Sequence, residues 1–178
     1  MKKLTLIILL LSTSLAFAQT RQTVTKAGVT YQIKNMGFTT SGFFSGFVGD
    51  IKFDKAHLAA SSIEASVETK TINSDDDARD EHLRKEDFFD VTHYPKIIMK
   101  SVSFQQKGGD NYLGKFELTI KGKTKLVDFP FSYLQTGTTG VFKGSFKINR
   151  LDFGIGDSSL VLSNEATITV TLETVLHD

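Results

Sequence analysis

ATITVTLE, residues 166–173, alternates apolar and polar side chains at every position. In an extended strand, one face would carry Ile168, Val170 and their apolar neighbours, and the other face would carry the threonines. One apolar face and one polar face are typical of a strand with the core on one side and water on the other, as in antiparallel sheets. The stretch therefore predicts an antiparallel β-sheet whose apolar face turns inward.

The same alternation recurs through most of the chain and predicts about eight strands. Turn-forming residues separate several of them, as at 107–110, 121–123 and 136–138. Short connections of this kind join antiparallel neighbours. The expected strands lie within residues 29–33, 43–53, 63–67, 97–103, 112–120, 127–133, 142–148 and 166–172.

Eight antiparallel strands can form either a two-layer sandwich or a closed barrel. Glycines inside the expected strands, such as Gly114 and Gly144, favour sharply coiled strands, and closure removes exposed strand edges. We therefore predict an all-β fold: one eight-stranded antiparallel barrel domain over residues 19–178. Its lumen would be filled by side chains or would hold a slender ligand.

The first eighteen residues have the features of a secretory signal peptide. Lys2 and Lys3 precede an apolar run over residues 4–15, and Ala16-Phe17-Ala18 is a cleavage site of the small-x-small type. The mature chain is expected to begin at Gln19 and to be periplasmic or secreted. No later segment approaches twenty continuous apolar residues, so no stable membrane insertion is expected.

Composition narrows the classes of partner and of stabilising bond. Lys plus Arg number 21 and Asp plus Glu number 20, a balance that gives no electrostatic case for binding nucleic acid. The sequence contains no cysteine, so stability must come from packing rather than from disulfides. Fifteen phenylalanines and no tryptophan supply bulky, purely apolar rings for that packing.

RDEHLRKEDFFDVTHYP, residues 79–95, interrupts the alternation and concentrates charged residues. Acid–base catalysis and a metal site are both disfavoured, because the acids suit a helix N-terminus and the four histidines lack ligand spacing. We instead predict a short helical insertion that covers one end of the barrel. Its charged residues would face solvent, and Phe88 and Phe89 would point into the lumen.

Four ordered segments resemble the motifs of the YceI-like family. They are GFVGDIKFD (46–54), RDEHLRKEDFFDVTHYP (79–95), GKFELTIKG (114–122) and INRLDFGIG (148–156), and together they span nearly the whole mature chain. The resemblance implies an extended lipocalin-like barrel that holds a long isoprenoid lipid or a quinone tail in an apolar tunnel. It implies no catalytic residue and no cofactor besides such a bound lipid.

One departure from the family pattern concerns the head group of the ligand. The family often has a histidine in its first strand, where this chain reads Lys34-Asn35-Met36-Gly37. Head-group recognition therefore cannot be carried over from relatives.

These observations predict a binding protein rather than an enzyme. The alternative is a solid-core barrel that acts as a stress or interaction protein through its outer surface, without a bound lipid. Separately, an exposed strand or the face that carries Ile98 could pair two barrels as a homodimer. The residues expected to line the lumen are Phe43, Phe47, Ile51, Phe53, Phe88, Phe89, Met99, Phe116, Leu118, Phe131, Phe142, Phe146, Ile168 and Val170. Structural roles are expected for Arg79, Asp80, Pro95, Arg150 and Asp152.

Overall fold

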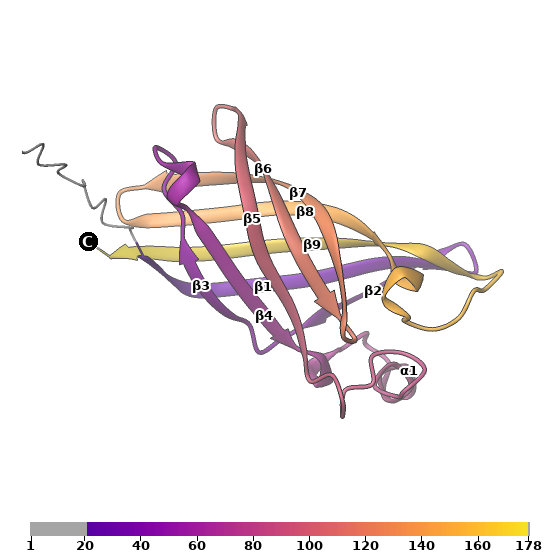
Figure 1. The fold of residues 1–178 in the computed structure, drawn as a ribbon. Helices are drawn as coiled ribbons and strands as arrows, with labels where there is room; N and C mark the ends of the chain where they lie inside the picture. The colour runs from indigo at the N-terminus through magenta and orange to yellow at the C-terminus, as the bar shows by residue number, and fades with distance from the viewer. Residues whose placement is uncertain (1–20, 178) are drawn as a thin grey trace, which may run out of the picture.

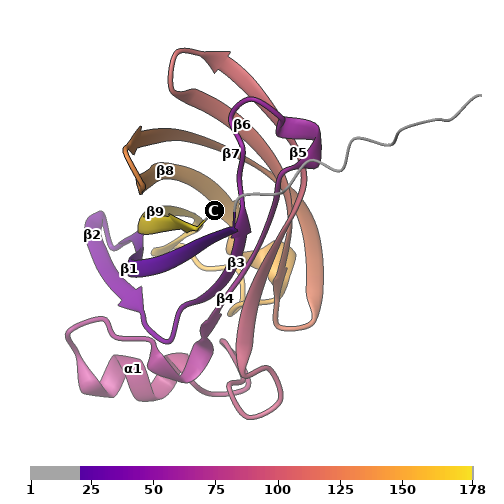
Figure 2. The ribbon, with the colours of Figure 1, turned by 90° about the vertical axis from the view of Figure 1, so that its left-hand side faces the viewer.

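The computed structural model describes residues 21–177, and they form a closed antiparallel barrel. The first strand, β1 (Arg21–Asn35), pairs along its length with the last, β9 (Leu162–His177), and this pairing closes the sheet (Figure 1). Figure 2 looks into the barrel from the end where the C-terminus lies. The predicted signal peptide, residues 1–18, and its cleavage site lie outside the described residues.

The other elements follow one another around the barrel in sequence order. The strands are β2 (Phe38–Phe44), β3 (Val48–Lys52), β4 (Ser62–Glu68), β5 (Lys96–Gly108), β6 (Asn111–Ile120), β7 (Lys123–Thr136) and β8 (Thr139–Asn149). The helices are α1 (Asp77–Leu83) and the 3-10 turns η1 (Leu58–Ala60), η2 (Thr69–Thr71) and η3 (Arg150–Phe153).

Nine strands fill eight positions around the barrel, because β2 and β3 share one position. Both pair antiparallel with β1: Phe44 lies opposite Val29, and Ile51 lies opposite Gln22. Between β2 and β3, Gly46 adopts a positive φ of 67°, which glycine tolerates without steric cost. The prediction of an eight-stranded antiparallel barrel is confirmed, with one strand interrupted.

The barrel interior at the end of the molecule near the C-terminus is filled by aromatic rings. Phe53 is 2% exposed, and five rings surround it at centroid distances of 5.0 to 5.7 Å, mostly edge to face. This is the arrangement that aromatic quadrupoles prefer. We call Phe53 and its five neighbours the aromatic cluster: Phe53, Phe104, Tyr112, Phe131, Tyr133 and Phe142.

Buried polar groups beside the aromatic cluster are hydrogen-bonded to one another. Gln22 donates from Nε2 to the carbonyl of Phe53 (2.9 Å) and to the hydroxyl of Tyr133 (3.1 Å). Its Oε1 accepts from Thr174 Oγ1 at 2.7 Å. Since these groups satisfy one another, this end of the barrel is a packed core.

The opposite end is covered by the connection between β4 and β5, residues 69–95, which contains α1 (Figure 1). The side chain of Asp76 accepts from the backbone N–H of Arg79 at 2.9 Å and so caps the helix. The helix begins where the acidic residues are, as the sequence predicts. Within the described residues, no helix is long and apolar enough to cross a membrane.

The segment around η3, residues 150–157, completes the cover. The backbone N–H of Gly156 donates to the carbonyl of Asp87 at 2.8 Å. Lys121 Nζ, at the β6–β7 turn, donates to the carbonyls of Glu86 (2.6 Å) and Gly154 (3.0 Å). We call residues 69–95 and 150–157 together the end cover.

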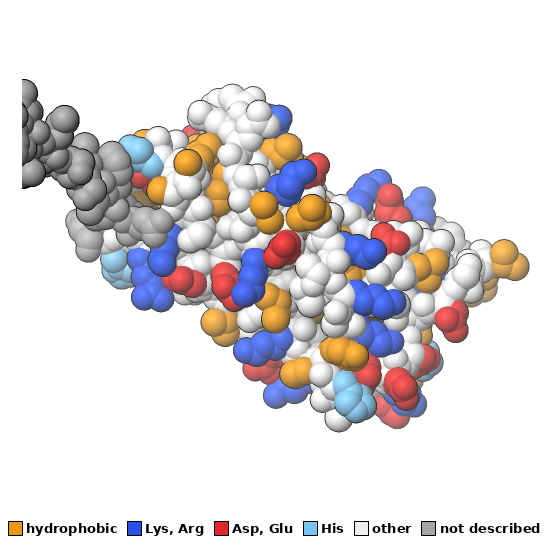
Figure 3. All heavy atoms as spheres, viewed as in Figure 1, with side chains coloured by type: hydrophobic (Ala, Val, Ile, Leu, Met, Phe, Trp, Pro, Cys, Tyr) orange, Lys and Arg blue, Asp and Glu red, His pale blue; other side chains and the backbone are white. Residues whose placement is uncertain are grey.

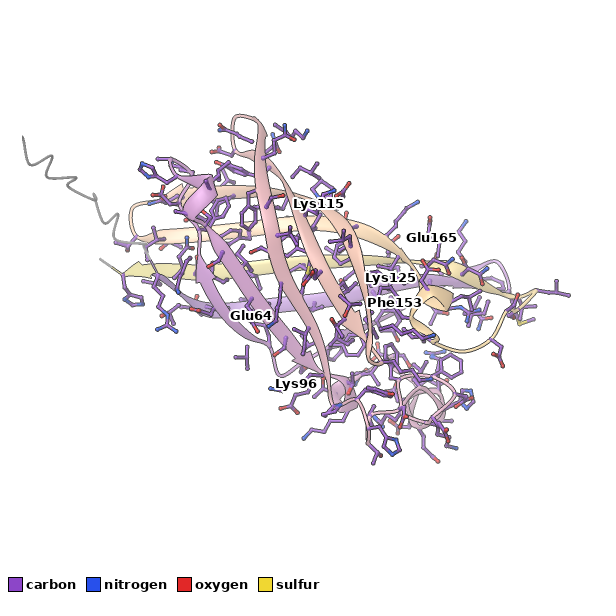
Figure 4. The ribbon with its side chains drawn as sticks, in the orientation of Figure 1. Glu64, Lys96, Lys115, Lys125, Phe153 and Glu165 are labelled. Carbon is purple, nitrogen blue, oxygen red and sulfur yellow. The ribbon has the colours of Figure 1, made fainter. Side chains whose placement is uncertain are left out.

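The outer face of the strands carries charged and other polar side chains together with a few exposed apolar ones, such as Val102 and Leu126. Glu64, Lys115 and Lys125 are exposed there, whereas Phe153 of η3 is buried in the core (Figure 4). An ion pair of 3.0 Å joins Glu64 to Lys100 on the neighbouring strand. Such exposed pairs stabilise a fold little, so the stability of the barrel depends mainly on its interior.

Candidate ligand-binding site

Three cavities lie in a row inside the barrel, between the end cover and the aromatic cluster. The outer cavity, at the end cover, has a volume of about 280 Å³, and the inner cavity has a volume of about 100 Å³. A connecting cavity of about 50 Å³ shares lining residues with both. The outer and inner cavities share only Ile97 and Ile168 among their lining residues, whereas the connecting cavity shares six with each, so it lies between them.

The inner cavity is lined almost entirely by apolar side chains from strands around the barrel. Ser66 is the one polar residue among the described residues that line it. Its walls are Val29, Phe47, Ile63, Ala65, Ser66, Val67, Ile97, Met99, Phe116, Leu118, Phe129, Phe131, Phe142, Phe146, Ile168, Val170 and Leu172. Such a space suits a hydrocarbon chain, because nothing in its walls needs a polar partner.

The outer cavity combines apolar walls with polar groups. Isoleucines and leucines from six elements form most of its surface, together with Phe44, Phe88 and Phe89. The polar side chains that line it are Tyr31, Asn35, Thr40, Arg79, His82 and Arg150. The cavities thus run from a mixed environment at the end cover to an apolar one in the middle of the barrel.

The Tyr31 hydroxyl is the most informative of these polar groups. It is buried, and none of the described residues places a donor or an acceptor in hydrogen-bonding position beside it. Burial, and then the charge of Asp80, raises the pKa of Tyr31, while Arg79 and the nearby Ser74 hydroxyl act in the opposite direction. The phenol therefore stays protonated and can donate a hydrogen bond to a bound molecule.

Arg150 belongs to the end cover and holds its second segment, residues 150–157, in place. Its side chain is buried at 3% exposure, and its guanidinium donates to the carbonyls of Ile155 (2.7 Å), Asp157 (2.7 Å) and Ser163 (2.9 Å). Burial lowers the pKa of Arg150, and the charge of Asp157 partly offsets this effect. The planar fork of the guanidinium fixes the loop between η3 and β9 beside the outer cavity.

Asp80 and Arg79 hold the start of the end cover through Ser74. Asp80, 4% exposed, accepts from the backbone N–H of Ser74 at 2.9 Å and from its hydroxyl at 2.5 Å. Arg79 donates to the Ser74 hydroxyl at 2.8 Å and to its carbonyl. The expectation that the charged residues of the insertion face solvent is therefore wrong for Asp80, which is buried because two donors need its carboxylate.

Replacing Asp80 with alanine is expected to lower the free energy of unfolding by about 2–3 kcal/mol, because two buried donors on Ser74 lose their acceptor. Asp80→Asn keeps one acceptor oxygen and should lose less than half as much. Chemical denaturation of the two variants measures both values. Wild-type stability of Asp80→Ala would contradict a structural role for this carboxylate.

Most of the residues predicted to line the lumen do line a cavity. Phe88 and Phe89 line the outer cavity. The inner cavity is lined by Phe47, Met99, Phe116, Leu118, Phe131, Phe142, Phe146, Ile168 and Val170. Ile51 and Phe53 are instead buried in the packed core and line none of the three cavities.

Phe43 requires a correction, because it lies on the outside of the barrel with 42% of its surface exposed. Its neighbours Thr40 and Phe44 line the outer cavity instead. The sequence analysis assumes that the inward-facing side chains stay at odd-numbered positions all the way from Phe43 to Phe53. The interruption at residues 45–47 shifts that phase by one residue, and a one-residue shift exchanges the two faces of a strand.

The remaining predicted residues lie at the edges of the end cover. The carbonyl of Pro95, just before β5, accepts from the backbone N–H of Thr69 at 3.0 Å. Asp152 lies exposed in the first turn of η3. Sequence reasoning gave no site role to Tyr31 or Ile97, although both stand on alternating apolar faces, because alternation does not separate a cavity wall from a packed core.

The described residues offer no centre for metal chemistry. Among residues 21–177, no group of three or more His, Cys, Asp or Glu side chains could hold a metal ion. His82 lies 3.3 Å from Asp87 and packs against the ring of Phe88. The arrangement thus fits binding of an apolar chain with a polar end.

Comparison with known proteins agrees with this geometry. A family profile described as YceI-like domain matches residues 19–174. A UPF0312 protein of Vibrio cholerae is 30% identical over 145 residues, which are 76% of this chain and 77% of that protein. A UPF0312 protein of Azotobacter vinelandii is 28% identical over 156 residues, 84% of this chain and 81% of that protein.

Solved structures share the fold. BcnA of Burkholderia cenocepacia superposes with a TM-score of 0.79 at 28% identity, covering 83% of this chain and 95% of BcnA. A polyisoprenoid binding domain from Saccharophagus degradans gives a TM-score of 0.69 at 11% identity, covering 89% of this chain and 99% of that domain. The match of the family profile to nearly the whole described chain means that this protein belongs to the family of YceI-like domain proteins.

Proposed function

We propose that this protein is an exported binding protein that holds a long isoprenoid lipid, or the isoprenoid tail of a quinone, inside its barrel. The observation that carries the proposal is the row of three cavities with apolar walls. Each methylene that a guest buries there would contribute roughly 0.8 kcal/mol, so a long tail needs little polar anchoring. The Saccharophagus domain with the same fold is a polyisoprenoid binding domain, and this supports an isoprenoid guest for the present protein.

The cavities also suggest how the guest is oriented. The polar groups lie in the outer cavity, and the inner cavity is apolar apart from Ser66. A guest with a polar head would therefore place its head beneath the end cover and its tail toward the aromatic cluster. A polar end and an apolar interior are what a carrier of a lipid with a polar head needs, and this function requires no chemical reaction by any side chain.

Tyr31→Phe tests the orientation. Because the Tyr31 hydroxyl has no hydrogen-bond partner among the described residues, its removal should leave the melting temperature of the empty protein unchanged or slightly higher. Retention of a prenylquinone, whose carbonyl can accept from the hydroxyl, should fall about 3- to 10-fold. Retention of a plain polyprene of equal length should not change.

Tyr133→Phe is the matched control, because that hydroxyl accepts from Gln22 at 3.1 Å in the packed core. It should reduce stability slightly and leave the preference between quinone and polyprene unchanged. If Tyr31→Phe instead destabilised the empty protein, the hydroxyl would be bonded internally, with Ser74 as its partner.

Organic extraction of the purified protein followed by mass spectrometry tests the function itself. A prenyl lipid or prenylquinone at close to one molecule per barrel is the expected result. A protein that yields no lipid, and that takes up none when mixed with prenylquinone, would favour the alternative of a solid barrel acting through its outer surface.

Export is part of the proposal and rests on the sequence of residues 1–18. N-terminal sequencing of protein from the periplasm or the medium should begin at or near Gln19. Recovery of the full-length chain from the cytosol alone would contradict export.

A further inference from the structure

Four large apolar side chains project into solvent at one extremity of the barrel. Met36 is 70% exposed, Phe38 78%, Val161 53%, and Leu160 is fully exposed. They come from two connections, the β1–β2 hairpin and the loop that precedes β9, which extend together beyond the end cover (Figure 1). We call these four side chains the apolar tip, and Figure 3 shows hydrophobic side chains at that extremity.

Hydrogen bonds fix the two connections to each other and give the tip one shape. The backbone N–H of Met36 donates to the carbonyl of Val161 at 2.8 Å. Ser159 Oγ accepts from the backbone N–H groups of Val161 (3.2 Å) and Leu162 (3.1 Å). The tip is therefore one built surface with contributions from both ends of the sheet.

The hairpin departs from the usual chemistry of its turn. Met36 and Gly37 both have positive φ, 51° and 83°, in a two-residue loop between the paired residues Asn35 and Phe38. A turn of this geometry prefers Asn or Asp at the first position, and a methionine there costs conformational energy. An exposed methionine at a turn position that prefers Asn or Asp departs from local sequence preference, and such departures are expected at functional sites.

The tip is also free of charge over a considerable length of chain. No charged residue occurs from Asn35 to Thr40 or from Ser158 to Asn164. A surface that only contacts water is not expected to group Met, Phe, Leu and Val without charges between them. A surface that enters the interfacial layer of a bilayer is expected to have this composition.

The tip adjoins the proposed binding site directly. Asn35, which precedes Met36, and Leu162, which follows Val161, both line the outer cavity. Whatever covers the tip therefore lies next to the cavity that would receive the head of the guest.

We propose that the apolar tip inserts reversibly into the surface of a lipid bilayer and places the outer cavity beside the membrane for exchange of the guest. The inference rests on the proposed function, since a guest of this kind resides in membranes. The four exposed side chains together present less than the roughly 800 Å² per partner that a stable dimer buries. The absence of charge in both segments indicates insertion into a zwitterionic bilayer, with weak dependence on salt.

Flotation with phosphatidylcholine vesicles tests the insertion without any guest. The double variant Phe38→Ser/Leu160→Ser should bind the vesicles at least about tenfold more weakly than the wild type. The control Leu126→Ser/Leu134→Ser removes two other exposed apolar side chains, 64% and 55% exposed, from β7 and should bind as the wild type does. Raising the salt from about 0.1 M to 0.5 M should change wild-type binding less than twofold.

Transfer of a fluorescent prenylquinone from loaded protein to the same vesicles tests the exchange. The tip variant should transfer several-fold more slowly, with an unchanged melting temperature and unchanged retention of quinone in the absence of vesicles. The inference would be overturned if the tip variant floated with vesicles and transferred quinone as well as the wild type does. Binding that requires anionic lipid would also overturn it, as would a tip variant whose only effect is to disrupt a dimer. Failure of the proposed function is a separate result: the wild type would take up no quinone.

Discussion

Replacing Phe53 with alanine is expected to lower the free energy of unfolding by about 3–5 kcal/mol, the range for removing a large aromatic side chain from a packed core. The ring is 2% exposed and lies within 5.7 Å, centroid to centroid, of five other rings. Its removal would leave a void that these rings cannot all move to fill. Denaturant unfolding followed by tyrosine fluorescence measures the loss.

The control for this prediction is Phe38→Ala, which removes the same ring from a position that is 78% exposed. Its effect on stability should stay within about 0.5 kcal/mol. Lipid retention by folded Phe53→Ala should equal that of the wild type, because Phe53 lines none of the three cavities. A loss below about 1 kcal/mol would mean that the aromatic cluster is not the packed core of the barrel.

The fold follows from the sequence because alternation is a local property. Each strand shows its inner face directly, as Ile168 and Val170 do on β9. The number of strands allows a sandwich or a barrel, and the glycines inside the strands favour the barrel. Alternation could not reveal the change of phase at residues 45–47. A positive φ at Gly46 is available to any glycine, and nothing in the neighbouring residues requires it.

The site is less predictable than the fold, because inward-facing residues do not report whether space remains between them. Phe53 and Phe146 both alternate correctly and both are buried, yet only Phe146 lines a cavity. The difference depends on how side chains from six or more strands meet in three dimensions. The unpaired hydroxyl of Tyr31 is likewise a result of tertiary packing and leaves no trace in the sequence.

The apolar tip is visible in the sequence, but a search for alternating strand residues does not detect it. Met36-Gly37 at a hairpin turn and Leu160-Val161 in a loop are apolar residues where polar ones are usual. Neither pair belongs to a strand pattern, so neither enters a prediction of the core. Their meaning depends on the pairing of β1 with β9, which brings the two connections together.

Replacing Phe146 with tryptophan is expected to remove most of the bound long-chain lipid while the fold survives. Phe146 lines both the inner and the connecting cavity, so a larger ring would project into the space that joins the inner cavity to the outer one. Overpacking of a core usually costs about 1–3 kcal/mol, and the space beside Phe146 should keep the loss at the lower end. Retention of a long prenyl chain should fall at least about tenfold, equivalent to about two lost methylenes.

Chain length supplies the internal control. A short prenylquinone that fits within the outer cavity should bind the Phe146→Trp variant as well as it binds the wild type, because Phe146 does not line that cavity. Phe104→Trp enlarges a ring of the aromatic cluster that lines none of the three cavities, and it should not change the length preference. Extraction and mass spectrometry of each variant, with its melting temperature, give the comparison.

Alanine at Phe146 and Phe116 separates a cavity wall from a filled core. Both rings are buried and line the inner cavity, so their removal should cost less than the removal of Phe53 and should admit a bulkier guest. The opposite outcome is equally definite. If both alanine variants lost about 3–5 kcal/mol and Phe146→Trp kept its full lipid content, these phenylalanines would only fill a core. The guest would then have to bind elsewhere on the protein.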